Sequence, residues 1–312
     1  MYSRLKALEN LTEKEIENIQ SSKVAIIGLG ATGSVIAESL ARYGVKIKLF
    51  DRDYLEENDL YSSTIYTASQ CQNSIPKAEA AYERLKEFTE VEKKIESLNS
   101  GNLKALDDVD IVIDATDNMD TRFLINEYCQ KNNKAWIYTA ALAEKGYSMM
   151  FRGKCFNCIF EQIKPGKLGT CRTEGILRDI AAISAHRTCL KAVRFLAGKE
   201  VDEKLDVIPS GDSLDVEASG CEVCREQNYP HLDSNQRVSS VCGENKYQIN
   251  ADVGQEAFET LRTQGEVIAD NDYILRVKVD GRNFALYRSG GALLEAEDKG
   301  HAESRFSEIL GI

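Results

Sequence analysis

The sequence lacks the long apolar run that a membrane-spanning protein needs. Its longest apolar stretches, residues 24–30 and 110–115, are far shorter than the roughly 20 residues of a transmembrane helix. The first residues carry charges where a secretory signal peptide has an apolar segment. We therefore expect a cytoplasmic protein that has no membrane partner.

Positive charge is also in deficit. Lysine and arginine total 39 against 50 aspartate and glutamate residues, which gives a formal net charge of −11. Such a chain matches the phosphate backbone of nucleic acids poorly, and we expect no nucleic-acid partner. Histidine is scarce as well. The three histidines, His186, His231 and His301, lie in unrelated contexts, and we assign them no role.

The chain is long enough for two domains. Its 312 residues exceed the roughly 150 of an average domain. A hydrophobic content of 43% beside 29% charged residues is typical of a folded soluble protein. Near residue 240 the pattern changes to short strands followed by a closing helix. We expect a first domain over residues 1–235 and a small one over residues 240–312.

Apolar strands alternate with helical segments through the first domain. The strands are expected within residues 23–30, 45–51, 107–118 and 135–141, and helices of crossover length separate them. This alternation predicts an α/β fold with a Rossmann-like, mostly parallel sheet and helices on both faces. The tail predicts an appended α+β extension.

A glycine-rich turn follows the first predicted strand. Gly28, Gly30 and Gly33 form the pattern GxGxxG ahead of a predicted helix, whose first N–H groups can bind phosphate. Asp51 ends the next strand, where a carboxylate can accept hydrogen bonds from ribose hydroxyls. The alternative is a turn that serves only helix–strand packing. These residues do not separate a dinucleotide from ATP.

Two further elements add charged groups suited to a triphosphate. A predicted strand brings Asp114 and Asp117 to the carboxyl edge of the sheet, where a carboxylate suits Mg²⁺. Lys77, at the start of a predicted helix, can reach phosphates. The alternatives are a surface lysine for Lys77 and a helix N-cap for Asp117.

Cysteines are paired in a metal-binding pattern. Cys155 and Cys158 form one CxxC motif, Cys221 and Cys224 form another, and 62 residues separate them. Four thiolates can hold one Zn²⁺ ion, whereas a redox CxxC is the competing interpretation. Cys171 lies in a polar segment beside Arg172 and Arg178, which could favour its thiolate; an incidental loop cysteine is the alternative.

The order of these motifs resembles the ubiquitin-activating-enzyme-like adenylyltransferases, specifically the ThiF/MoeB group. The resemblance covers about residues 1–225. It is carried by the segments GLGATG, LFDRD, PKAEAA, DATDNMDTRFLIN, CFNC, TCRTEG and CEVC. The tail is similar to a C-terminal extension that some members carry, and we assign it no role.

The resemblance implies a role for each matching residue. Asp51 would bind ribose, Lys77 phosphates and Asp117 Mg²⁺, and the four paired cysteines would bind Zn²⁺. Arg4 would reach the ATP of the other subunit in a homodimer, and Cys171 would form covalent sulfur-carrier adducts. The remaining nucleotide-binding positions implied are Asp53, Asn58 and Asn118.

One departure from the family pattern affects the phosphate site. Where the family has N-L-x-R-Q, this chain reads NDLYSST, so Ser62 or Ser63 stands at the position of a phosphate-contacting arginine. Asn58 or Asp59 then occupies the position of the family asparagine. Loss of a fixed cation removes charge stabilisation, and Arg52 or Arg4 could replace it.

The implied function is ATP-dependent adenylation of the C-terminal glycine carboxylate of a ubiquitin-like, β-grasp sulfur-carrier protein. Pyrophosphate would leave, and a sulfur donor or Cys171 could then attack the activated carbonyl. Three alternatives stay open: a nicotinamide-dependent oxidoreductase, a weakened nucleotide-binding scaffold of the same fold, and adenylation of a peptide or metabolite carboxylate.

Overall fold

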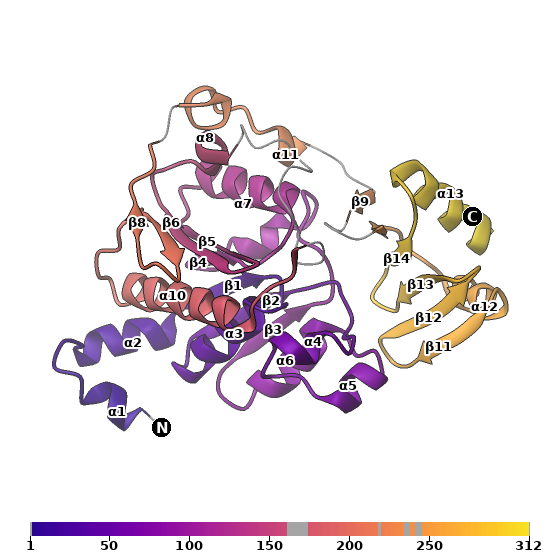
Figure 1. Ribbon diagram of the computed structural model, residues 1–312, viewed down its shortest axis with the longest axis horizontal. Helices are drawn as coiled ribbons and strands as arrows, with labels where there is room; N and C mark the ends of the chain where they lie inside the picture. The colour runs from indigo at the N-terminus through magenta and orange to yellow at the C-terminus, as the bar shows by residue number, and fades with distance from the viewer. Residues whose placement is uncertain (1, 161–173, 218–219, 234–237, 241–244, 312) are drawn as a thin grey trace.

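The computed structural model describes residues 2–160, 174–217, 220–233, 238–240 and 245–311. Its first body is built on an eight-stranded sheet of order β3-β2-β1-β4-β5-β6-β7-β8 (Figure 1). The strands are β1 (Lys23–Ile27), β2 (Lys46–Phe50), β3 (Val91–Lys94), β4 (Ile111–Asp114), β5 (Trp136–Leu142), β6 (Lys145–Phe151), β7 (Leu205–Ile208) and β8 (Ser213–Leu214). Strands β3, β2, β1, β4 and β5 pair in parallel, as the alternation of strands and helices predicts.

Helices cover both faces of this sheet, which explains why its central strands are apolar on both sides. One face buries α2 (Glu13–Ser21), α3 (Gly33–Arg42), α6 (Lys77–Leu85) and α10 (Arg178–Leu196). The other face buries η1 (Leu103–Leu106), α7 (Met119–Lys131) and α8 (Phe156–Phe160). Short helices α1 (Ser3–Lys6), α4 (Asp59–Ser62), α5 (Ala68–Gln72), η2 (Glu222–Glu226) and α11 (Pro230–Asp233) complete the body.

The sheet turns antiparallel beyond β5. A tight turn at Ala143, whose φ is +51°, reverses the chain into β6, and β7 and β8 continue the antiparallel pairing. The fold is therefore a mixed sheet with a parallel half and an antiparallel half. The nucleotide-site motifs of the sequence all belong to the parallel half.

A second, six-stranded antiparallel sheet of order β11-β12-β13-β14-β10-β9 forms the C-terminal body. Its strands are β9 (Val238–Ser240), β10 (Lys246–Ile249), β11 (Glu266–Asp270), β12 (Ile274–Val279), β13 (Arg282–Tyr287) and β14 (Ala292–Glu295). Helices α12 (Gln255–Thr263) and α13 (Lys299–Leu310) pack on one face around Phe258, Leu261 and Phe306. The closing helix is expected from the sequence, whereas α12 was not.

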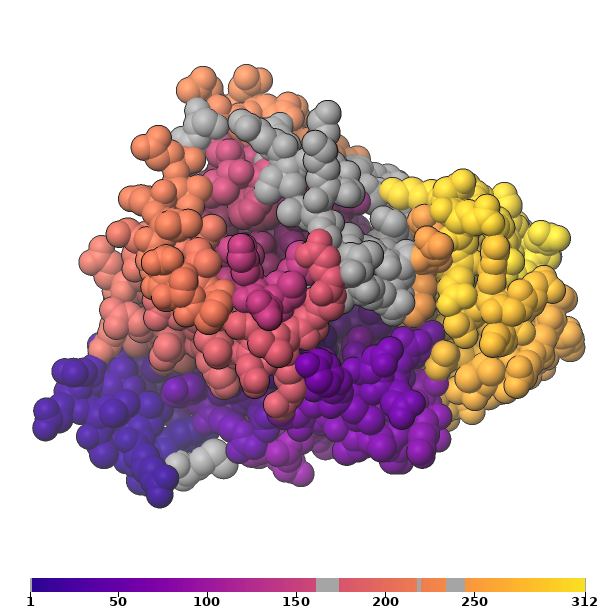
Figure 2. Space-filling model, in the orientation of Figure 1, coloured from indigo at the N-terminus to yellow at the C-terminus, as the bar shows by residue number. Residues whose placement is uncertain are grey.

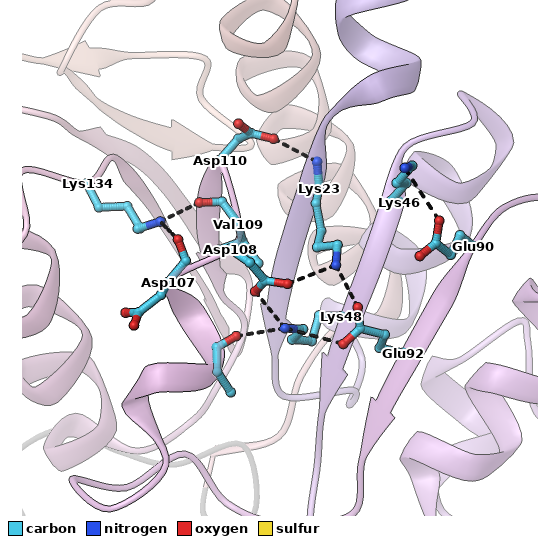
Figure 3. Close-up of polar contacts among 11 residues, drawn as sticks. Lys23, Lys46, Lys48, Glu90, Glu92, Asp107, Asp108, Val109, Asp110 and Lys134 are labelled. Carbon is cyan, nitrogen blue, oxygen red and sulfur yellow. Dashed lines mark hydrogen bonds and ion pairs between the residues drawn. The ribbon is translucent and has the colours of Figure 1, made fainter.

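An ion network closes the amino edge of the parallel strands (Figure 3). The Lys23 ammonium lies 2.6 Å from Glu92 and 2.9 Å from Asp108, and the nearly buried Lys48 ammonium lies 2.7 Å from Asp108. The hydrogen bond from Lys48 is the main cause that lowers the pKa of Asp108 to about 2. Because these charges are mutually satisfied at the edge opposite the glycine turn, we read this network as structural.

Among the described residues, no helix is both long and apolar enough to span a membrane.

Candidate nucleotide and metal sites

The glycine turn lies at the carboxyl edge of the parallel strands, between β1 and α3. Gly28 has φ +90°, and a Cβ atom there would lie 2.8 Å from the carbonyl oxygen of Ala115. A Cβ on Gly33 would lie 1.9 Å from the carbonyl oxygen of Gly28, whereas Gly30 faces open space. Two glycines thus allow close packing of the turn, and the third leaves room for a phosphate to approach the start of α3.

Asp51 follows β2 and is bonded into this turn. One carboxylate oxygen accepts a hydrogen bond from the Leu29 amide at 2.6 Å, and the other accepts one from the Asp53 amide at 2.7 Å. Burial, helped by the neighbouring Asp53 carboxylate, raises the pKa of Asp51 to about 7. A carboxylate at the end of the second strand can bind a ribose hydroxyl.

Lys77 begins α6 and points at carboxylates from the loop after β2. Its ammonium lies 2.9 Å from Asp59 and 4.0 Å from Asp53. Burial opposes the charged form, but the carboxylates of Asp59, Asp53 and Asp51 raise the pKa of Lys77 well above its usual value. Lys77 is therefore cationic at every physiological pH.

The departure from the family pattern lies in the same loop. The structure places Asp59 beside Lys77, while Asn58 is exposed and only precedes helix α4. Ser63 is buried, and its hydroxyl accepts a hydrogen bond from the Ile65 amide at 3.3 Å. Ser62 is half-buried. This loop thus places the Asp59 carboxylate beside Lys77, and neither Ser62 nor Ser63 supplies a cation there.

Strand β4 ends in a second acidic turn. Asp114 is fully buried, and its carboxylate accepts hydrogen bonds from the Thr116 hydroxyl at 2.6 Å and the Arg122 guanidinium at 3.1 Å. The Asp117 side chain is exposed to solvent. The protein atoms around it and the neighbouring Asp53 carboxylate disfavour its charged form, and its pKa is raised. An accessible carboxylate at this edge of the sheet suits a Mg²⁺ ligand. Asn118 instead caps α7, accepting a hydrogen bond from the Asp120 amide at 2.9 Å.

The four paired cysteines come together at the far end of α7. Their sulfur atoms all lie within 4.8 Å of one another, with Cys155 to Cys221 at 3.8 Å and Cys158 to Cys224 at 3.4 Å. Tetrahedral Zn²⁺ with bonds of about 2.3 Å separates its sulfurs by about 3.8 Å, so the cluster fits that ion. The redox alternative is weaker, because all four thiols meet at one point.

Helix α7 also supports the cysteine cluster. The buried Asn126 donates its amide to the Cys155 sulfur at 3.3 Å and to the Asn157 side chain at 2.8 Å. It also accepts a hydrogen bond from the Phe156 amide at 3.0 Å. Such outer contacts orient metal ligands.

Other predicted residues are not gathered at these sites. Arg4 is exposed on α1, at the opposite side of the first body from the C-terminal body (Figure 1). Cys171 and Arg172 lie outside the described residues. Arg178 begins α10 and is exposed.

Sequence reasoning missed three supporting residues on α7. Arg122 holds Asp114, Asn126 holds the Cys155 loop, and the fully buried Glu127 accepts hydrogen bonds from the His231 backbone at 2.8 Å and contacts its ring at 2.6 Å. His231 therefore has a structural contact. Buried polar residues on an otherwise apolar helix face were the available signal, since such groups need partners.

Comparisons with known proteins point to one family. The sequence model of the ThiF family matches residues 2–228. The sulfur carrier protein ThiS adenylyltransferase of Bacillus subtilis (strain 168) is 27% identical over 99% of this chain and 99% of its own length. Adenylyltransferase and sulfurtransferase MOCS3 of Arabidopsis thaliana is 27% identical over 65% of this chain and 46% of its own.

Solved structures share the fold of the first body. The structure of E. coli MccB with ATP has a TM-score of 0.58 at 19% identity, covering 68% of this chain and 69% of that one. The structure of PaaA has a TM-score of 0.52 at 18% identity, covering 66% of this chain and 66% of that one. At such low identity these similarities concern the fold alone.

Proposed function

Because the chain belongs to the ThiF family, we propose that it uses ATP to adenylate the C-terminal glycine carboxylate of a small β-grasp sulfur-carrier protein. The observation that carries the proposal is the convergence of the glycine turn, Asp51, Lys77 and Asp117 at one edge of the sheet. A relative matched along the whole chain is named as a ThiS adenylyltransferase, which supports this substrate class.

The reaction needs positioning and charge neutralisation more than acid–base chemistry. A carrier carboxylate oxygen attacks the α-phosphorus of ATP, a new O–P bond forms, and the bond to the bridging oxygen breaks. Pyrophosphate leaves with that electron pair, and no proton is transferred. Asp51 holds the ribose, the start of α3 faces the phosphates, and the permanently charged Lys77 stabilises the charge that develops on them.

The charge balance of the site favours a nucleotide that arrives with its metal. Asp51, Asp53 and Asp59 act on the Lys77 ammonium, and Asp117 lies near Asp53. Asp117 would hold Mg²⁺, which when bound neutralises the phosphate oxygens. Lys77 then exchanges Asp59 for a phosphate. We expect free ATP to bind much more weakly than MgATP, as titration in EDTA and in Mg²⁺ would measure.

The cysteine cluster has a structural role in this proposal. Cys155, Cys158, Cys221 and Cys224 would hold Zn²⁺ with every coordination position filled, so the ion would fix the fold without contacting substrate. In a later step a sulfur donor, or the Cys171 thiolate, would attack the carbonyl carbon of the acyl-adenylate; a C–S bond would form, the C–O bond to the phosphate would break, and AMP would leave.

Pyrophosphate release in the presence of candidate carriers tests the proposal. Wild type with MgATP and its carrier should release pyrophosphate, and mass spectrometry should detect the adenylyl mass on the carrier. Lys77→Met should lower the rate about 100-fold or more, because a fixed cation at the phosphates is lost. Lys86→Met is the matched control, since Lys86 follows the same helix and its ammonium pairs with Glu83 at 2.7 Å.

Three results would reject the proposal. Preferential binding of NADH over ATP would favour the oxidoreductase. Binding of ATP with no pyrophosphate release from any carrier would favour a nucleotide-binding scaffold, and release with small peptides instead would indicate a peptide carboxylate substrate.

A further inference from the structure

The C-terminal body packs against the first body (Figure 2). Tyr54, three residues after Asp51, is buried against Ile274, Tyr287 and Leu293 of the second sheet. The Arg276 guanidinium lies 3.8 Å from the centre of the Tyr54 ring. The two bodies thus meet at the loop that carries Asp51 and Asp53.

Within this interface, Gln248 of β10 joins the ends of two strands of the first sheet. Its side-chain oxygen accepts a hydrogen bond from the Arg52 guanidinium at 3.2 Å and another from the Ser97 hydroxyl at 2.5 Å. Its amide donates to Asn250 at 3.2 Å, and the residue is only 4% exposed. A buried amide whose hydrogen bonds are satisfied in this way adopts a single orientation. Gln248 therefore holds Arg52 and Ser97 in place.

Arg52 and Ser97 lie just beyond the ends of β2 and β3, next to the carboxylate proposed to bind ribose. Arg52 comes directly after Asp51 at the end of β2, and Ser97 follows β3, which pairs in parallel with β2. When a carboxylate ending the second strand binds ribose and the glycine turn binds phosphates, the base extends to the other side of the ribose. That side is the end of β2 and β3, which Gln248 bridges.

Arg52 is also close to the acidic groups of the site. Its charge partly opposes the rise in the pKa of Asp117 that burial and Asp53 cause, and its side chain lies 3.7 Å from the Asp53 carboxylate. A long arginine side chain has many rotamers, so its placement near a ligand depends on a fixed partner. Gln248 supplies that partner from a different domain.

We propose that the C-terminal body completes the nucleotide site, with Gln248 as the positioning residue that fixes Arg52 and the end of β3 around the ribose and base of ATP. This inference rests on the proposed function, and it gives the tail a role in binding the nucleotide.

The test compares Gln248→Met with wild type in ATP titration and in carrier-dependent pyrophosphate release. We expect the Kd and KM for ATP to rise about tenfold, the loss typical of a hydrogen bond to a charged group, while kcat stays within about twofold. The preference for ATP over GTP should fall, because one wall of the base site is loosened. The KM for the carrier should not change.

Two further variants separate positioning from loosened docking. Lys246→Met removes an ion pair to Glu56 at 3.7 Å in the same interface, and it should leave ATP affinity unchanged. Arg52→Met combined with Gln248→Met removes both partners of this hydrogen bond, so no Arg52 guanidinium is left at the interface without its acceptor. In the Arg52→Met background, Gln248→Met should add little to the loss of ATP affinity.

The outcomes distinguish this inference from the proposed function. If wild type binds ATP and Gln248→Met binds it equally well with the same nucleotide preference, the inference is wrong and the proposed function stands. If wild type binds ATP and the variant does not, but no carrier elicits pyrophosphate, the inference stands and the proposed function fails.

Discussion

Asp51 combines two properties that rarely occur together in a ligand-binding carboxylate. Both of its oxygens already accept backbone hydrogen bonds, from Leu29 and Asp53. Burial nevertheless raises its pKa to about 7, so its charge changes within the physiological range. A carboxylate has lone pairs to spare for a ribose hydroxyl, and the ionised form accepts that bond more strongly.

The KM for ATP should therefore fall as the pH rises from 6 to 8. Below pH 7 the Asp51 carboxyl group is protonated in most molecules. Above pH 7 it is ionised in most molecules, and because the ionised form is the stronger hydrogen-bond acceptor, the affinity for ATP increases with pH. Initial rates of pyrophosphate release at varied ATP would measure this dependence. Asp51→Asn should bind more weakly and lose the slope between pH 6 and 8; a slope that survives the substitution would assign the titration to another group.

Two buried tyrosines give a matched pair for stability. The Tyr287 hydroxyl is buried and has no hydrogen-bond partner among the described residues, whereas the Tyr66 hydroxyl donates to the Leu29 carbonyl at 2.7 Å. Tyr287→Phe should keep or raise the free energy of unfolding, since an unsatisfied buried group costs about 1–3 kcal/mol. Tyr66→Phe should lower it by about 1 kcal/mol. Urea unfolding compares them, and an equal loss in both would contradict the expectation.

Helix α7 is the element that joins the two candidate sites. Near its start Arg122 holds Asp114 of the acidic turn, and one turn later Asn126 holds the Cys155 loop. Further contacts from Glu127 tie the chain after the second CxxC pair to the same helix. Because a helix is stiff over these distances, the acidic turn and the cysteine cluster keep a fixed separation.

Asn126→Asp should weaken metal retention at the cysteine cluster. The variant keeps an acceptor for the Phe156 amide but replaces the donor to Cys155 with a negative charge. We expect zinc transfer to a chromogenic chelator to be about 10- to 100-fold easier, the range seen when contacts behind metal ligands are removed. Asn132→Ala, at the end of the same helix, is the control, because Asn132 contacts only the Tyr128 carbonyl there. Equal release from both variants would count against this role.

At the scale of the whole molecule, sequence patterns predict features formed by residues that are close in sequence. They do not predict contacts between segments that are far apart in sequence. The parallel half of the sheet, the Thr12–Glu15 capping box and the glycine turn all follow from residues close in sequence. The antiparallel strands β6 to β8 and helix α12 do not, since their pairing depends on tertiary packing. Arg52 and Gln248 are 196 positions apart in the sequence, and no local sequence pattern predicts the hydrogen bond between them.

The same limit applies inside the candidate site. The motif spacing brings Lys77 and Asp117 to one edge, but the choice between Asn58 and Asp59 depends on where helix α4 begins. A shift of one residue changes which side chain meets Lys77, and sequence patterns rarely place helix ends that closely.

Substitution of Arg4 tests whether the protein acts as a homodimer in which each subunit contributes to the ATP site of the other. It is exposed on α1, so in a homodimer it could serve the partner's ATP site. Arg4→Ala and Lys77→Met should each be inactive alone. After mixing and subunit exchange, half of the dimers are mixed and each has one intact site, so about a quarter of wild-type activity should return. A mixture as inactive as its components would place Arg4 outside the partner's site.

The cysteine cluster has a topological consequence. A metal ion held by Cys155, Cys158, Cys221 and Cys224 turns the intervening chain into a closed ring that contains α10, β7 and β8. Closing a ring of that length lowers the conformational entropy of the denatured state. By the chain-entropy account of cross-links, this stabilises the folded state by on the order of 4 kcal/mol. Removal of the ion would thus destabilise α10, β7 and β8, although none of these elements supplies a ligand to it.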